Sequence, residues 1–160
     1  FNNNGGKFLY CETSSELQTN LNKIIEENSW SDKTALILNP GLKDKFDWID
    51  FNTTKKIEEA DFLFTTCEYL IASDGSLLIS SNQIAEKKLS ELPEDFIVFA
   101  TTSQFVETIS TGLQGIKAQN KKNIPTNITT IKHFKVEETN NFLSYGSSSK
   151  NLYLLLLEDL

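Results

Sequence analysis

The chain has 160 residues, of which 39% are hydrophobic and 11% aromatic, and it carries a formal charge of −7. These values fit one globular domain with a full core and exclude a disordered chain. All fifteen basic residues are lysine. An acidic chain without the planar guanidinium of arginine is a poor match for nucleic acid. The longest apolar run, at 152–157, is far shorter than the roughly 20 residues of a membrane span, so we expect no membrane partner.

The cysteine content limits which metal sites the chain can form, and the methionine content bears on where the native chain begins. Cys11 and Cys67 cannot form a disulfide framework, and they cannot supply the four ligands of an iron–sulfur cluster. We therefore expect no metal and no cofactor on this chain, and a reducing cytoplasm as its location. Methionine is absent. We expect the native N-terminus to lie outside this sequence, with residues 1–4 as a flexible segment before a domain at 5–160.

The first third of the chain predicts a strand, a helix and a second strand. Residues 7–12 have strand character, and 14–28 carry apolar residues at helical spacing behind a Ser14 or Ser15 N-cap. The apolar run at 33–39 follows as a strand. This order is the signature of a parallel sheet.

Apolar runs mark the remaining strands. Asp74-Gly75 separates the runs 61–72 and 76–80 and predicts a turn, because glycine supplies the positive φ that tight turns need. A helix is predicted at 103–119 behind a Ser103 cap. The predicted strands are 61–72, 76–80, 95–101, 127–134 and 151–159. We expect one α/β domain with five or more strands in a mostly parallel sheet flanked by helices.

Four stretches of the sequence resemble one protein family. They read GGKFLYCE at 5–12, TTCEYLIASDGSLLISSNQ at 65–83, LPEDFIVFATTSQFVETI at 92–109 and NLYLLLLED at 151–159. The chain is similar to the LUD domain family of lactate utilization protein C and its YkgG-like relatives, over nearly its whole length. The resemblance implies a fold like that of the sugar-phosphate isomerase and CoA-transferase group. Family members act with iron–sulfur partner proteins in oxidising lactate to pyruvate, so such subunits are the implied partners.

The family pattern is partly kept around the Asp-Gly turn. Relatives usually read Ala, then Glu or Arg, Thr, Gly, and Ser or Thr. Here Gly75 and Ser76 survive, while Ser73 and Asp74 replace the two residues before them. Gln83 matches the last residue of the family's Ser-Ser-Arg-Gln.

The pattern departs further from the family toward the C-terminus. The family's Ser-Arg-Thr-Ala-Asp segment is missing between Ile131 and Leu152. Ser147 stands where the family's histidine would be, and Lys150 is retained. The stretches that predict the strands and helices of the family are kept, while the motifs of its best candidate ligand-binding loops are lost.

The Asp-Gly turn and a later polar loop are the candidate ligand site. The turn can cradle an anion through backbone N–H groups, or it can be a hairpin turn and nothing more. The loop at 145–150 has the glycine, hydroxyls and ammonium of an anion loop without the spacing of a nucleotide P-loop; a solvent loop is the alternative. If both lie at the carboxyl ends of parallel strands, they meet in one crevice. The predicted ligand-binding residues are Asp74, Gly75, Ser76, Gln83, Gly146, Ser147 and Lys150.

Glu68 and Asp74 are weak candidates for a catalytic role. CoA-transferase relatives of the implied fold use a glutamate nucleophile, but no matching motif surrounds Glu68. Asp74 would be the only acid in the predicted pocket, and a carboxylate with a usual pKa of about 3.9 is a weak base at neutral pH. Cys67 beside a carboxylate fits a buried structural thiol, and His133 has no clustered ligands around it. We expect the site to be weak or silent in catalysis.

Three classes of function remain open from the sequence. The first is a LUD-type accessory or binding protein of lactate utilization that takes a small anionic ligand. The second is an enzyme of the same fold that acts on a small acid, a CoA ester or a sugar phosphate. The third is a diverged paralogue that serves protein–protein interaction alone.

Overall fold

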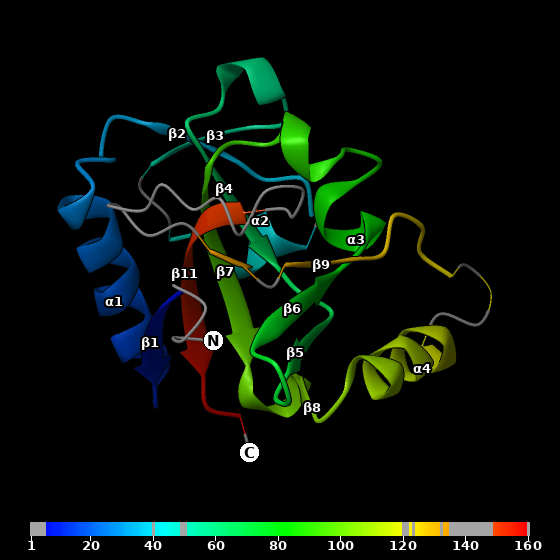
Figure 1. Ribbon diagram of the computed structural model, residues 1–160. Coiled ribbons are helices and arrows are strands. Elements are labelled where there is room, and N and C mark those ends of the chain that lie inside the picture. Colours follow the sequence, from blue (N-terminus) through cyan, green and yellow to red (C-terminus); the bar gives the residue numbers. More distant parts are fainter. Residues whose placement is uncertain are drawn as a thin grey trace.

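The computed structural model describes residues 6–39, 41–48, 51–119, 122, 124–131, 133–134 and 149–159, with the backbone alone at 133–134 and 149–150. Its central element is a parallel sheet (Figure 1). The main strands are, in spatial order, β1 (Lys7–Cys11), β11 (Ser149–Leu157), β7 (Asp95–Thr101), β4 (Phe62–Thr66), β2 (Thr34–Leu36) and β3 (Asn52–Thr54). The short β10 (His133–Phe134) pairs with the start of β11. Every strand pair in this sheet is parallel.

A second, smaller sheet packs against the first. Its strands are, in spatial order, β8 (Phe105–Val106), β5 (Tyr69–Ile71), β6 (Ser76–Ile79) and β9 (Thr129–Ile131). β6 runs antiparallel to both of its neighbours, whereas β5 and β8 are parallel. The chain leaves the first sheet at the end of β4 and enters the second within three residues, so one apolar run supplies strands to both sheets.

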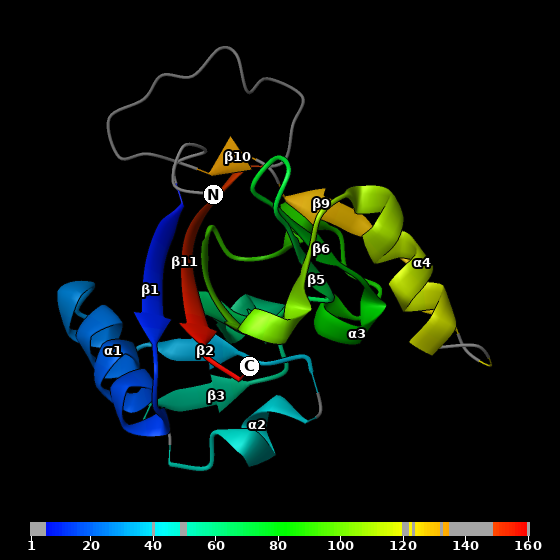
Figure 2. The ribbon, with the colours of Figure 1, turned by 90° about the horizontal axis from the view of Figure 1, so that it is seen from below.

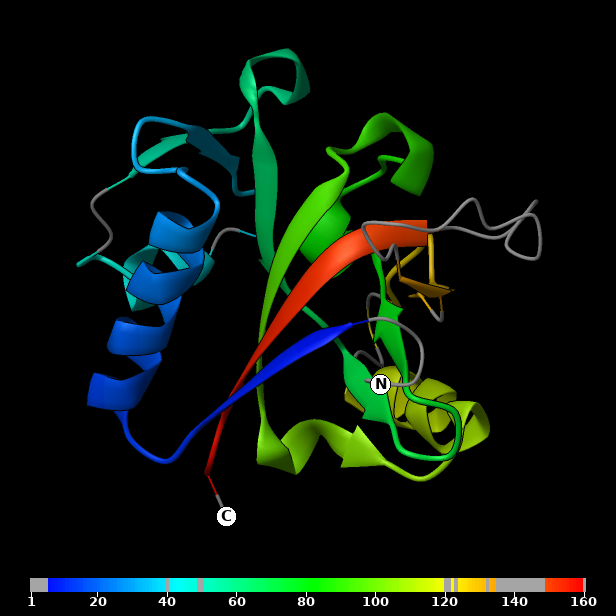
Figure 3. The ribbon, with the colours of Figure 1, turned by 60° about the vertical axis from the view of Figure 1, so that its left-hand side comes forward.

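The described part of the molecule has four layers; Figure 3 shows α1 to the left of the parallel sheet, and the second sheet and α4 to its right. Helix α1 (Ser14–Glu27) covers one face of the parallel sheet, and the second sheet covers the other. Helix α4 (Ile109–Gln119) packs on the outer face of the second sheet. The remaining helical segments are short: α2 (Leu42–Lys45), α3 (Ser81–Ile84) and the 3₁₀ turns Ile57–Glu59, Leu89–Glu91 and Thr102–Gln104.

Helix α1 forms where its apolar residues repeat at helical spacing. Its buried residues face Tyr153 and Leu155 of β11 across one core cluster. Thr13 caps the helix, since its hydroxyl accepts a hydrogen bond from the Glu16 N–H at 3.1 Å. The cap lies one residue before the Ser14 or Ser15 predicted from the sequence, because Thr13 retains an extended backbone while Ser14 is already helical.

The core between the two sheets is almost wholly aliphatic. Alternate residues of β11 and β7 enter it together with side chains of β5 and β6. Both faces of β11 and β7 are buried, which explains why their sequences are continuous apolar runs. Among the described residues, no helix is long and apolar enough to cross a membrane.

The fold class predicted from the sequence is confirmed, and three details of it are wrong. The helix predicted at 103–119 begins only at Ile109, because residues 102–104 form a 3₁₀ turn and 105–106 pair as β8. Ser103 is therefore not its cap; the Thr108 hydroxyl accepts from the Thr111 N–H at 3.2 Å. The strands predicted at 61–72 and 127–134 are each split between two sheets.

Candidate functional site

The order of strands opens a crevice between the carboxyl ends of β2 and β4. After β2 the chain turns to α2, whose Leu42 packs in the same core cluster as α1. After β4 the chain turns to the opposite face and forms the second sheet. Figure 2 shows α2 beside β2 and β3, with α1 and the second sheet on opposite sides of β1 and β11. Neighbouring parallel strands whose connections leave to opposite faces create the ligand crevice of open α/β sheets.

A hollow of about 280 Å³ lies at this point, above the ends of β2, β4 and β7. Its lining mixes polar and apolar side chains, and α2 contributes both Leu42 and Lys45 to it. The lining residues are Asn39, Gly41, Leu42, Lys45, Thr66, Cys67, Phe99, Thr101 and Gln104. They come from three separate segments of the chain, 39–45, 66–67 and 99–104, so only the folded topology brings them together.

Asn39 joins the two strand ends that flank the crevice. Its amide nitrogen donates to the Thr66 hydroxyl at 3.0 Å, and its amide oxygen accepts from the Gly41 N–H at 3.2 Å. Both ends of the amide are therefore used within the protein. Asn39 fixes the width of the crevice and the start of the turn into α2.

Gln104 fixes the wall of the crevice that the end of β7 forms. Its amide nitrogen donates to the Cys67 carbonyl at 2.7 Å, and its amide oxygen accepts from the Thr101 N–H at 2.8 Å. The side chain thus ties the end of β7 to the segment that follows β4. These polar groups are rigid parts of the wall, positioned before any ligand binds.

Asp159 holds the turn that carries Gln104. Its carboxylate accepts from the Thr102 hydroxyl at 2.8 Å, the Ser103 N–H at 2.8 Å and the Ser103 hydroxyl at 2.6 Å. These hydrogen bonds, led by the one from the Ser103 hydroxyl, lower the pKa of Asp159 to about 2. The end of β11 is therefore tied to the loop that follows β7.

Lys45 supplies the positive charge of this hollow. Its Nζ lies 4.8 Å from the centroid of the Phe99 ring, which is itself buried. A cation over an aromatic face is attracted by the ring quadrupole, so the ammonium has a preferred place at the hollow. A carboxylate that enters the hollow meets this charge.

Cys67 is not equipped for nucleophilic chemistry. The side chain is buried, and burial together with the neighbouring Glu68 carboxylate raises the pKa of the Cys67 thiol well above its ordinary value. The thiol is protonated at neutral pH, and thiolate is the reactive form. Among the described lining residues there is no histidine and no carboxylate, so none can act as a general base of the usual kind.

A second hollow of about 480 Å³ adjoins the first and shares Asn39 with it. It lies above the ends of β2 and β3, beside α2. Its lining residues are Ile37, Leu38, Asn39, Lys43, Asp44, Thr53, Thr54 and Lys55. A further hollow of about 300 Å³, between α1 and Trp48, lies away from these strand ends and carries Glu26 but no cation.

The Asp-Gly stretch singled out from the sequence is the turn of the β5–β6 hairpin. Gly75 has a φ of 73°, and its N–H donates to the Ile71 carbonyl at 2.9 Å. The Asp74 carboxylate accepts from the Ser76 N–H at 3.0 Å and the Ser76 hydroxyl at 2.7 Å. The Ser76 side chain is 1% exposed. The described hydrogen bonds thus account for these residues as turn chemistry.

Two other predicted residues, Gln83 and Glu68, form hydrogen bonds at the N-terminal cap of α3. Gln83 and Ser80 form a capping box on α3, in which the Gln83 amide oxygen accepts from the Ser80 N–H at 2.7 Å. The Glu68 carboxylate accepts from the Ser80 hydroxyl and the Asn82 amide, each at 2.8 Å. Neither Gln83 nor Glu68 lines the two hollows at the strand ends.

The rest of the predicted pocket lies outside the described residues. This applies to Gly146 and Ser147, and to the side chain of Lys150. The meeting of these residues with Asp74 therefore stays a prediction. Among the described residues, no group of three or more histidine, cysteine or acidic side chains could hold a metal ion.

Sequence reasoning missed the residues of the crevice. Asn39, Thr66 and Thr101 each lie within or at the end of an apolar run and look like ordinary polar residues. Asn39 and Thr101 end the strands predicted at 33–39 and 95–101, and that position is the signal that could have found them. Thr66 had no such signal, because it lies inside the strand predicted at 61–72. Lys45 and Gln104 had no such signal, because their places depend on α2 and on the 3₁₀ turn, which the sequence did not predict.

Two comparisons with known proteins agree with this architecture. A family model described as LUD domain matches residues 1–156. Among solved structures, the chain is similar to a DUF162 family protein from Deinococcus radiodurans, whose crystal structure was determined at 1.70 Å resolution. The match has a TM-score of 0.62 and 15% sequence identity, and covers 97% of this chain and 89% of that one. At this identity the likeness shows the shared fold. No curated protein matches the chain.

Proposed function

Since this chain belongs to the LUD domain family, we propose that it is an accessory or binding protein of lactate utilization. It holds a small carboxylic acid in the crevice at the ends of β2, β4 and β7. It is weak or silent as a catalyst by itself. Its partners are iron–sulfur subunits that carry out the oxidation of lactate to pyruvate, in the cytoplasm.

The chemistry of the first hollow carries this proposal. Lys45 gives it one cation, Asn39 and Gln104 make its walls rigid, and Cys67 is protonated. Such a site attracts a small anion, and it offers neither a thiolate nor a base for turning it over. Binding without turnover fits an accessory subunit better than an isolated enzyme.

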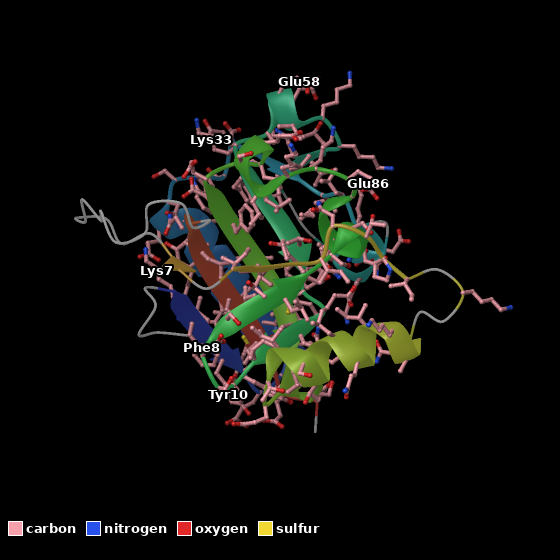
Figure 4. The ribbon with its side chains drawn as sticks, turned by 45° about the vertical axis from the view of Figure 1, so that its right-hand side comes forward. Lys7, Phe8, Tyr10, Lys33, Glu58 and Glu86 are labelled. Atoms are coloured by element: carbon pink, nitrogen blue, oxygen red, sulfur yellow. The ribbon has the colours of Figure 1, made fainter. Side chains whose placement is uncertain are left out.

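A binding experiment with lactate and pyruvate tests the proposal. A ligand present at a hundred times its Kd adds about 2.7 kcal/mol to stability, which a thermal shift detects easily. Lys45→Gln should weaken binding about tenfold, the usual effect of losing a hydrogen bond to a charged group. Lys33→Gln is the matched control, because Lys33 is exposed and precedes β2 at its opposite end. Figure 4 shows Lys33 at the other end of the molecule from Tyr10, which lies near the end of β1.

The outcomes separate the open alternatives. Binding that Lys45→Gln weakens and Lys33→Gln spares supports the proposal. Turnover of a small acid or a CoA ester by the isolated chain would favour the enzyme instead. Absence of binding to either acid would contradict the proposal and leave the interaction paralogue.

The pocket predicted at Asp74, Gly75, Ser76, Gln83, Gly146, Ser147 and Lys150 is a second proposed location. Against it, the Gly75 and Ser76 N–H groups are already used inside the hairpin. Asp74→Ala distinguishes the two locations, since it should leave binding in the crevice unchanged. A loss of binding in Asp74→Ala, with the fold intact, would move the site to the hairpin.

A further inference from the structure

The second hollow has a net positive charge, although the chain as a whole is acidic. Lys43 and Lys55 both line it and are exposed, and within the described residues neither forms an ion pair. Asp44 lines it too, so the hollow has an excess of one positive charge. The whole chain has a formal charge of −7. Two lysines at one hollow of so acidic a chain form a local site of attraction for anions.

The carboxylate of Glu59, which follows β3 in the chain, does not line the hollow and is engaged elsewhere. Glu59 accepts from the Thr54 hydroxyl at 3.0 Å and lies 3.8 Å from Lys56, the residue after Lys55. Its carboxylate is thus engaged by two other groups. The Thr53 hydroxyl also lines the hollow and makes no hydrogen bond with the described residues, so it can donate to a ligand.

The size of the two hollows together exceeds what lactate needs. They measure about 280 and 480 Å³ and share Asn39, which lines both. Pockets of roughly 300–1,000 Å³ hold ligands of cofactor or drug size, whereas lactate has six heavy atoms. Lys45 lines the first hollow, and Lys43 and Lys55 line the second.

We infer that the second hollow is a phosphate site, and that the crevice takes a small carboxylic acid carrying a phosphate group at a distance from its carboxylate. The carboxylate lies by Lys45, and the phosphate lies between Lys43 and Lys55. Lysine binds phosphate as a point charge and needs no fixed geometry, which suits two exposed side chains on different elements. This inference rests on the proposed function for the first hollow only.

Matched pairs of acids test the inference. The probes are glycerate and gluconate, each compared with the same acid phosphorylated at its terminal hydroxyl, and binding is measured by calorimetry. At least one phosphorylated acid should bind about tenfold or more tightly than its parent, the effect of a charged hydrogen bond to phosphate. Raising the salt concentration should reduce this advantage, because exposed lysines are screened.

Variants place the phosphate in the second hollow. The double variant Lys43→Gln/Lys55→Gln should remove the advantage of the phosphorylated acids, and binding of lactate and pyruvate should be unchanged. Lys45→Gln should weaken both members of a pair and keep their ratio. Lys33→Gln again serves as the control for a lost surface charge.

Each outcome decides the inference separately from the proposed function. Equal binding of phosphorylated and parent acids overturns the phosphate site, while lactate binding would still support the first hollow. An advantage of phosphate that survives in the double variant also overturns it. If lactate and pyruvate fail to bind but the phosphorylated acids bind through Lys43 and Lys55, the proposed function fails and the phosphate site stands.

Discussion

Asn39 and Gln104 show how single amide side chains shape the crevice. Each makes hydrogen bonds at both ends of its amide, to groups that belong to different strand ends. A side chain fixed in this way loses little further entropy when a ligand binds beside it. The crevice is therefore built of rigid neutral walls and one cation, Lys45, which lies above the Phe99 ring.

Asp159 gives a prediction at the residue scale. Its lowered pKa means that the folded state favours the carboxylate over the acid. The resulting stabilisation is present above the ordinary pKa of 3.8 and is lost as the pH falls through about 2. Asp159→Asn should therefore be less stable than wild type at neutral pH, and the difference should shrink between about pH 4 and pH 2. Urea unfolding across this range measures both effects.

A matched variant controls the Asp159 experiment. Asp32 is exposed, and its carboxylate makes no hydrogen bond with the described residues, so Asp32→Asn removes the same charge without the same contacts. It should leave the unfolding free energy nearly unchanged. A stability difference for Asp159→Asn that stays constant with pH would contradict the assigned role of the carboxylate.

At the scale of elements, α4 packs on the second sheet through two glycines. A Cβ added at Gly112 would lie 3.0 Å from a Leu78 methyl group. A Cβ at Gly115 would lie 2.3 Å from the Tyr69 hydroxyl oxygen and 2.7 Å from the ring carbon that bears it. The helix can therefore approach the sheet closely only because these positions lack side chains.

Gly115→Ala tests this packing through the sign of its effect. In the wild-type background it should lower the unfolding free energy by about 1–3 kcal/mol, because the Tyr69 ring must move. In a Tyr69→Ala background the clash is gone. The same substitution should then stabilise the protein by up to about 1 kcal/mol, the gain in helix propensity of alanine over glycine. Urea unfolding of the four proteins in the cycle measures both values, and a stabilising effect in both backgrounds would refute the close packing.

The elements that were predictable from the sequence are those with a strong local pattern. α1 was predicted nearly to its ends, because Leu17, Leu21 and Ile24 repeat on one face. The hairpin turn at Asp74 was predicted from its Asp-Gly pair. β3 and α2 were missed, since each is three or four residues long and too short for any period to show.

At the scale of the whole molecule, the sequence predicted the parallel sheet but not the second sheet. Residues 61–72 form one apolar run, and no local signal marks the place between β4 and β5 where the chain changes sheets. The change of sheet decides where each end of that run lies in the fold. It puts Thr66 and Cys67 at the crevice and Tyr69–Ile71 in the hairpin whose turn carries Asp74.

The sequence allowed the general location of the candidate site to be predicted, but not the residues that line it. Ligand crevices at the carboxyl ends of parallel strands were expected from the fold class. Which residues line the crevice depends on the strand order, in which β11 lies between β1 and β7 and β2 lies beside β4. That order is a property of long-range pairing, and no local pattern in a single sequence encodes it.

The location of the ligand is the central claim, and chemical-shift mapping by NMR tests it most directly. Lactate is titrated into the uniformly ¹⁵N-labelled protein, and the amide signals are followed. The largest shifts should fall on Asn39, Thr66 and Gln104, at the ends of β2 and β4 and after β7. Shifts confined to Asp74–Ser76, with the amides of the crevice unmoved, would contradict the account.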